Sequence, residues 1–510
     1  MEPLTLTTPE QHDYNDPTVE RDAERLRAWL SNLPIMDVVQ ALRLVQGALD
    51  SLNEQKLEPE KRYQLLDMFR HTAERLYVTV DPLRIRQLSL TKSQREQATR
   101  GVERLSLAMA GGYKIIVKAL YEAAAQGPPG NLFGLAINRA IEQLGSILID
   151  SYRFYRAVQE SLFAELHQLY RLARYFGLLA VTAANEDSEQ PPGIAECYHA
   201  IMLLALTDPF RLAEGEAGLL HDVLKQHAGQ CRVIPGSHWS VVPDGLYLLD
   251  LKSDAPPEFC TQLGQQVAIA QEPYLLDARE ALHAIRERLE LTPVKVRGQS
   301  PEAMLLRRLL PEESVTQRRE SRHPDNRGTH LVTGLDAIHT YLLHVPLGGV
   351  AAAESAINNV PVKPSPCRIV DSSEHGMRLA WDEGIAGDAC VGDLLGIVND
   401  GQCLQLAIAR SVQIHPMEGM EIGVEIMRGN CGPVYCHAQA DDEAKPIRAL
   451  FMLSSGEDDV AATLVMAKGY YEPGRRLLID SSGRAVRARA GHNVSDSPMF
   501  DRFEFATDES

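Results

Sequence analysis

The sequence lacks the features that mark exported, membrane-spanning and metal-binding proteins. Residues 1–20 contain no basic region followed by an apolar one, which a secretory signal requires, and we expect a cytoplasmic protein. No stretch approaches the roughly 18 uncharged apolar residues that cross a bilayer, so we expect no membrane insertion. The eight cysteines form no C-x-x-C pair, which favours reduced thiols and leaves no metal site to predict.

Motifs that carry catalysis are also absent. The chain contains no G-x-S-x-G, no Walker loop, no H-E-x-x-H and no glycine-rich dinucleotide fingerprint. The group Cys431, Cys436 and His437 lacks a fourth ligand for zinc. The run Asp480–Gly483 resembles an aspartic protease loop only faintly, has no second copy and predicts a hairpin turn. We therefore expect no enzymatic activity and no cofactor, and a hydrolase has no motif in its favour.

Positive charge is scarce in this chain. Lys and Arg number 51 against 69 Asp and Glu, which gives a formal net charge of −18. Such a balance opposes nonspecific binding of nucleic acid or anionic lipid over the whole surface, and we expect no nucleic-acid partner. An anionic ligand would have to be captured by a local basic cluster.

Length and composition predict a multidomain protein. A chain of 510 residues is too long for one hydrophobic core, and 45% hydrophobic with 24% charged residues is typical of globular proteins. The predicted fold class is α + β, with an all-α helical array in the first half and β-rich domains in the second. The predicted segments are a flexible stretch at 1–30, a helical domain at 31–185, a helical domain with short strands at 190–300, a β-barrel domain at 311–430 and a β-rich extension at 435–510.

Apolar periodicity is the basis for the helical half. Apolar residues between Ile35 and Leu52 recur at steps of three and four, so one face of a helix is apolar. The same period returns in 59–78, 93–125, 131–157 and 160–182. The spacing of the aromatic residues between 152 and 175 is typical of tetratricopeptide-like packing, although no clean repeat of the diagnostic length is present.

Short β-rich runs separated by turn residues occupy the second half. They lie at residues 368–370, 377–381, 394–398, 403–409 and 422–426. Five or six strands at this spacing predict a small, six-stranded barrel. Four further runs predict the strands of the extension, at 448–453, 462–467, 476–479 and 485–488.

A basic run precedes the predicted barrel. Arg318, Arg319 and Arg322 form the pattern R-R-x-x-R. The planar guanidinium fork pairs with phosphate, matches the acceptor edge of guanine and stacks on a flat ring, so this cluster is a candidate binding site for a nucleotide. A solvated basic linker is the alternative interpretation.

A second pattern, D-x-S-x-x-G, follows the predicted strand at 368–370. It consists of Asp371, Ser373 and Gly376. The carboxylate accepts hydrogen bonds from N–H donors, the hydroxyl adds a further polar group, and glycine allows the backbone to turn sharply after the strand. The alternative is an Asx or Ser turn that closes a β-hairpin.

These two patterns, in this order, resemble the signature of PilZ domains. The run Glu421–Glu425 resembles the closing strand of PilZ barrels, and the resemblance covers about residues 314–427. The stretches Leu203–Leu212 and Gly334–His339 look like parts of long proteobacterial proteins that have a helical front half and a C-terminal PilZ domain. The resemblance implies a PilZ-type barrel in which the three arginines, Asp371, Ser373 and Gly376 bind cyclic di-GMP.

The function implied by this resemblance is that of a cyclic di-GMP receptor. It would pass the signal to an unidentified protein partner through the helical half, with motility, attachment or polysaccharide production as the output. The alternative is a helical scaffold or adaptor whose barrel binds no nucleotide. This alternative is favoured by a long insertion, because 49 residues separate Arg322 from Asp371, more than is usual in the family. The insertion includes a predicted helix at 335–343 and implies a rebuilt ligand-facing edge or a docking surface for a partner.

Overall fold

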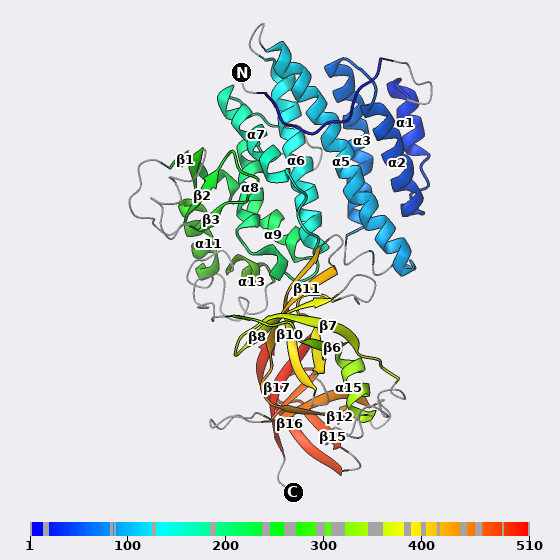
Figure 1. Ribbon diagram of the computed structural model, residues 1–510, viewed down its shortest axis with the longest axis vertical. Helices are drawn as coiled ribbons and strands as arrows, with labels where there is room; N and C mark the ends of the chain where they lie inside the picture. Colours follow the sequence, from blue (N-terminus) through cyan, green and yellow to red (C-terminus); the bar gives the residue numbers. More distant parts are fainter. Residues whose placement is uncertain are drawn as a thin grey trace. The chain divides into compact units, whose positions relative to one another are not determined.

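A computed structural model of the chain forms two compact units. The first contains Met1–Pro209 and Glu214–Gln317, and the second contains Phe210–Ala213 and Arg318–Ser510. Figure 1 shows the elements of each unit. The structure describes residues 3–13, 20–81, 85, 88–124, 129–183, 190–236, 245–259, 272–291, 301–307, 322–344, 361–381, 389–398, 404–415, 419–438, 446–453, 462–481 and 484–507.

The first unit contains the predicted helical array. In α2 (Val38–Asn53) the apolar residues at steps of three and four are buried, and the carboxylate of Asp37 caps the first turn by accepting from the N–H of Gln40 at 3.1 Å. The other helices are α1 (Ala23–Ser31), α3 (Pro59–Thr79), α5 (Lys92–Ala123), α6 (Asn131–Arg153), α7 (Leu162–Tyr175), α8 (Ile194–Ala205), α9 (Glu216–Lys225), α11 (Arg279–Leu291) and α13 (Pro301–Arg307). The helical array predicted at 31–185 is confirmed, whereas tetratricopeptide-like packing stays a prediction.

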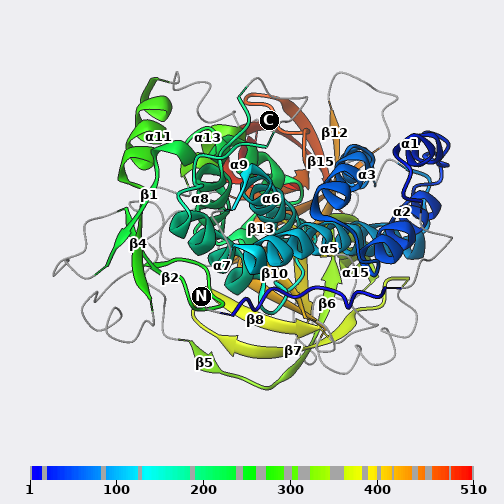
Figure 2. The ribbon, with the colours of Figure 1, turned by 90° about the horizontal axis from the view of Figure 1, so that it is seen from above.

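Helices α5 and α6 form the centre of the array. Helices α2 and α3 pack against α5, and α7, α8 and α9 pack against α6 (Figures 1 and 2). Helix α6 is long and apolar enough to span a bilayer, with a mean hydropathy of 1.3 over an 18-residue window. However, 78% of that window is buried inside the unit, which is the environment of a core helix.

A small antiparallel sheet belongs to the same unit. Its strands lie in the order β1-β4-β2-β3. Their bounds are Arg232–Pro235 for β1, Leu246–Asp250 for β2, Glu258–Phe259 for β3 and Pro273–Asp277 for β4. Residues 1–30, for which we expected flexibility, contain helix α1 and an extended segment at 5–13 that is hydrogen-bonded to the helices.

The second unit begins with the predicted six-stranded barrel, which is confirmed. Six of the described strands close into a ring in the order β7-β6-β9-β10-β11-β8, because β7 and β8 also pair with each other. A short strand, β5, extends the edge of β7 beyond the end of β6. The bounds are β5 (His323–Pro324), β6 (Gly328–Thr333), β7 (Ser365–Ser372), β8 (Gly376–Trp381), β9 (Leu394–Val398), β10 (Gln405–His415) and β11 (Gly419–Ile426).

The predicted β-rich extension is a second closed barrel. Its six described strands run in the order β12-β13-β14-β17-β16-β15. They are β12 (Asn430–Ala438), β13 (Ile447–Leu453), β14 (Thr463–Ala467), β15 (Arg476–Ser481), β16 (Arg484–Asp496) and β17 (Phe500–Thr507). The hairpin predicted at Asp480–Gly483 is present, since Ser481 pairs with Arg484.

One hydrophobic cluster joins the two barrels. It combines side chains from β6, β9 and β10 with others from β12, β13, β14 and β17, and α15 (Leu335–His344) contributes Ile338, Tyr341 and Leu342. The ring Nε2–H of His339 donates to the carbonyl of Val434 at 3.1 Å. The helix predicted at 335–343 is therefore confirmed, and it packs between the two barrels.

A buried histidine in the helical unit gives this unit a pH dependence. His167 of α7 lies inside, where its Nε2 contacts the carbonyl oxygen of Ala255 at 2.9 Å and its Nδ1 contacts the hydroxyl of Tyr198 at 2.6 Å. Because a carbonyl only accepts, the proton lies on Nε2, and Nδ1 accepts from the tyrosine. Burial lowers the pKa of His167 to about 4, so the folded protein keeps this ring neutral in weak acid.

The helical unit should therefore lose stability as the pH falls from 6.5 to 4. The unfolded chain binds the proton first, since the ordinary histidine pKa is 6.5, and each such group costs about 1.4 kcal/mol per pH unit within that window. Denaturant unfolding followed by the helical circular dichroism signal measures this slope. The variant His167→Gln should show a shallower slope; equal slopes in the two proteins would contradict the assignment.

Candidate functional site

Asp371 lies near the end of strand β7, next to two other segments of the barrel. In the β7–β8 hairpin it pairs with Arg378, and on the other edge of β7 it pairs with Pro324 of β5. Asp371 is a charged residue, yet it is only 8% exposed. A carboxylate this deeply buried needs charged or hydrogen-bonding partners to remain ionised at low cost.

Two arginines supply these partners. Arg322 donates from Nη1 to Oδ1 of Asp371 at 3.0 Å. Arg378 donates from Nε to Oδ2 at 2.9 Å, and its Nη2 lies 2.6 Å from the same oxygen. We call Arg322, Asp371 and Arg378 the Asp371 clasp. Both guanidinium groups are about half exposed, so they are paired inward and still accessible from solvent.

Ser373 and Gly376 form the turn between β7 and β8. The N–H of Ser373 donates to the carbonyl of Gly376 at 2.7 Å, and the Ser373 hydroxyl donates to the same oxygen at 3.2 Å. A Cβ at Gly376 would lie 2.6 Å from the carbonyl oxygen of Val424 in β11. We expected this glycine to permit a sharp turn. The structure shows a different reason for glycine at this position, which is the close approach of the neighbouring strand β11.

Asp371 and Arg378 lie opposite each other on β7 and β8, and the next two partners across the sheet are small residues. Arg378 pairs with Gly423 of β11, and Gly423 pairs with Ser411 of β10 beside a β-bulge. A Cβ at Gly423 would lie 2.3 Å from the Ser411 hydroxyl oxygen, so a larger residue at this position would require the Ser411 side chain to rotate. The ion pair between Arg410 and Glu425, at 2.8 Å, links the same two strands, β10 and β11.

A third arginine is attached to the tip of the turn. Arg428 donates from Nη2 to Oε1 of Glu374 at 2.6 Å and also contacts Nε2 of His375 at 2.8 Å. Arg327, five residues after Arg322, is occupied differently: it pairs with Asp325 at 2.7 Å, and its hydrogen bonds lower the pKa of this carboxyl to about 2. Arg327 therefore belongs to a local pair outside the clasp.

The predicted site residues fall into three groups. Arg318 and Arg319 lie outside the described residues. Arg322 and Asp371 are in direct contact, and Ser373 and Gly376 form the adjoining turn. The long insertion does not separate Arg322 from Asp371. Strand β6 leads away from Asp371 to α15, and β7 returns antiparallel to β6.

Arg378 is the functional candidate that the sequence patterns missed. Asp371 and Arg378 are equally far from the centre of the β7–β8 turn, so hairpin register places them opposite each other. A search for opposite charges at mirrored positions of the predicted hairpin would have found the pair. Among the residues that the structure describes, no group of three His, Cys, Asp or Glu side chains is arranged to hold a metal ion.

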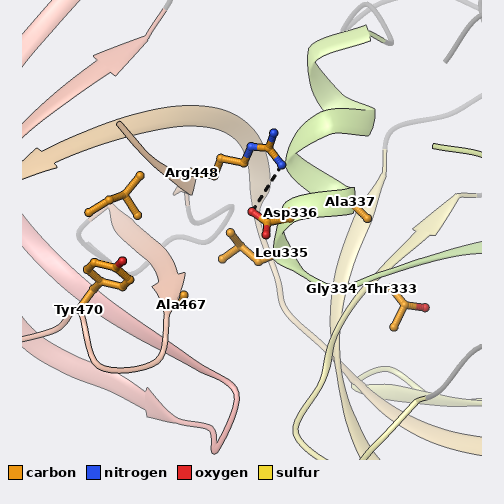
Figure 3. Close-up of a pocket in the computed structure, with 9 residues that line it drawn as sticks. Thr333, Gly334, Leu335, Asp336, Ala337, Arg448, Ala467 and Tyr470 are labelled. Atoms are coloured by element: carbon orange, nitrogen blue, oxygen red, sulfur yellow. Dashed lines mark ion pairs between the residues drawn. The ribbon is translucent and has the colours of Figure 1, made fainter. Parts of the chain in front are cut away.

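A hollow of about 450 Å³ lies elsewhere in the second unit, at the start of α15 (Figure 3). Its walls include Gly334 and Leu335 on one side and Ala467 and Tyr470 on the other. Arg448 spans it toward Asp336, with 3.6 Å between Nη1 and Oδ1. None of the residues of the clasp or of the adjoining turn lines this hollow.

Comparisons with known proteins match nearly the whole chain. The model of the N-terminal domain of the cyclic-di-GMP receptor FimW matches residues 24–236, and the model of the FimW C-terminal β-barrel domain matches residues 435–507. The cyclic-di-GMP receptor FimW of Pseudomonas aeruginosa is 22% identical over 585 aligned positions, which cover 99% of this chain and 94% of the relative. No solved structure matches. The Asp371 clasp lies between the two ranges that the family models match.

The close approach at Gly376 leads to a stability prediction. Gly376→Ala should destabilise the second unit by about 1–3 kcal/mol, because the new Cβ collides with a backbone carbonyl and β11 must move. Gly328→Ala is the matched control, since a Cβ there meets nothing within 4 Å. Thermal unfolding of both variants checks this, and equal midpoints would show that β11 accommodates the methyl group.

Proposed function

The chain belongs to the FimW family of PilZ-type proteins, and from this membership we propose that it is a receptor for cyclic di-GMP. The family predicted from the R-R-x-x-R and D-x-S-x-x-G patterns is confirmed by the two domain models and by the similarity along the whole chain. We propose that the protein works by binding and not by catalysis, and that it does so in the cytoplasm.

The Asp371 clasp is the observation that carries this proposal. It brings two guanidinium forks to one carboxylate on the outside of a closed barrel. A guanidinium pairs with phosphate as readily as with carboxylate, and it also matches the O6 and N7 acceptors of guanine. A cyclic dinucleotide offers both groups, so it can replace Asp371 as the partner of an arginine.

The proposed binding step is an exchange of partners within the clasp. When a phosphate or a guanine edge takes over Arg322, the Asp371 carboxylate becomes free to accept from the N–H donors of guanine. Gly423 pairs with Arg378 and carries no side chain, and we propose that a purine ring stacks on the Arg378 guanidinium beside it. The exchange leaves no charge of the clasp unpaired, which keeps the cost of breaking the Arg322–Asp371 bond low.

Signal transmission is proposed to follow from ordering. Arg322 directly follows the segment that carries Arg318 and Arg319, so a ligand that holds all three would draw residues 314–322 onto the barrel. The helical unit would then present a changed surface to a protein partner. We propose motility, attachment or polysaccharide production as the output.

A second candidate function is a scaffold or adaptor whose barrel binds no nucleotide. The clasp itself favours this alternative in one respect, because both described arginines are already neutralised by the protein. A ligand must therefore compete with an existing ion pair, and a barrel that has lost binding would retain the same pair as a purely structural link.

Titration calorimetry with cyclic di-GMP separates the two functions. We expect binding to the intact protein, and we expect Arg322→Ala and Ser373→Ala each to weaken it by about 10-fold or more, since a charge-assisted hydrogen bond contributes about 1.5–3 kcal/mol. Arg327→Ala is the control, because this arginine is held by Asp325. It should bind as the unmodified chain does.

One result would contradict the receptor function, and another would contradict the assigned site. Absence of heat with micromolar ligand and folded protein would leave the scaffold as the better account. Retained affinity in both Arg322→Ala and Ser373→Ala would move the site away from the clasp and its turn.

A further inference from the structure

Residues 5–13 run as an extended segment across the helices of the first unit. The chain there is the dark blue trace that crosses the helices in Figures 1 and 2. It contacts α7 first, then α5, and finally the turn between α2 and α3. We call residues 5–13 the strap and the surface beneath it the strap groove.

At α7 the strap is held through alternate backbone N–H groups. The N–H of Thr5 donates to Oε1 of Gln168 at 3.0 Å, and the N–H of Thr7 donates to Oε1 of Glu165 at 2.6 Å. Glu165 and Gln168 are three residues apart and therefore on one face of the helix. Between the two bonded threonines, Leu6 is 3% exposed.

The floor of the groove is charged. Lys114 of α5 and Glu165 of α7 form an ion pair of 2.7 Å in which both side chains are almost fully buried. The ammonium group of Lys118 donates to the hydroxyl of Thr8 at 3.1 Å. One Glu165 oxygen thus binds the strap while the other binds Lys114, so the strap completes the hydrogen bonding of a buried carboxylate.

At the α2–α3 turn the strap pairs as a strand would. The N–H of His12 donates to the carbonyl of Glu54 at 2.7 Å, and the N–H of Lys56 donates to the carbonyl of His12 at 3.2 Å. The side chain of Gln11 reaches the carbonyl of Gln55 at 3.0 Å. Lys56 also pairs with Asp13 at 2.8 Å.

Four of these contacts do not depend on the sequence of the strap. They use the backbone N–H groups of Thr5, Thr7 and His12 and the C=O group of His12, and apart from the missing N–H of proline any extended chain provides such groups. Only Leu6 adds a buried apolar side chain. If the strap left, water would reach Lys114 and Glu165 and hydrate both charges.

We propose that the strap groove is a docking surface for an extended polypeptide segment of a partner protein, which residues 5–13 occupy as a built-in competitor. The fitting segment has an apolar side chain between two residues with free N–H groups, as Leu6 lies between Thr5 and Thr7. It continues in extended form toward residues 54–56. The proposal concerns the helical unit alone and does not depend on cyclic di-GMP.

The test uses a fluorescent peptide with the sequence of residues 3–13 and the full-length chain. Leu6→Asp places a charge in the buried position and should release the strap. The peptide should then bind this variant at least about 10-fold more tightly than the unmodified chain, in which a tethered strap competes at an effective concentration near the millimolar range. Fluorescence anisotropy measures both affinities. Pro3→Asp, which adds the same charge at an exposed position, should behave like the unmodified chain.

Two further variants provide a second way to release the strap and a check that the peptide binds in the strap groove. Thr7→Pro in the full-length chain removes the N–H that Glu165 accepts and leaves the helical core untouched, so it should open the groove if Leu6→Asp does not fold. Gln168→Ala, added to either variant, should weaken peptide binding several-fold. Equal peptide affinity for the closed and opened chains, binding to neither folded variant, or no effect of Gln168→Ala would overturn the proposal.

Discussion

The carboxylate of Asp371 holds the candidate site together. Its two oxygens accept from two different arginines, one on β8 and one just before β5, so a single side chain connects three backbone segments. Burial makes this arrangement obligatory, since a carboxylate that is 8% exposed is costly without ionic partners. The same requirement makes the site sensitive to anionic ligands, because an anion that pairs with one of the two arginines changes the hydrogen bonds that Asp371 accepts.

The insertion before β7 shows how a barrel accommodates extra chain. Arg322 and Asp371 are far apart in sequence, yet antiparallel pairing of β5 with the end of β7 keeps them adjacent. The additional residues leave from the opposite end of β7, where α15 packs between the barrels. Sequence distance between two parts of a motif is therefore a poor measure of their separation in a sheet.

Sequence patterns predicted elements well where one local signal was sufficient. Strand β9 begins and ends at the predicted residues, because an apolar run is bounded by turn residues on both sides. Strand β12 was missed because Gly432 and Pro433 predict a break, although Pro433 pairs with Leu450. The partnership of Asp371 with Arg378 depends on register, which composition does not reveal. The reason for Gly376 lies in the neighbouring strand, and no local pattern contains it.

The hydrophobic cluster shared by the two barrels determines where the chain can be divided, both in gene fusions and in engineered chimeras. Leu394 and Leu406 of the first barrel and Leu450 and Phe500 of the second are buried in the same cluster. Cutting the chain between β11 and β12 would expose apolar side chains on both fragments. The barrels therefore form one exchangeable module, and a chimera that retains the second unit intact from β5 to β17 has the best prospect of remaining soluble.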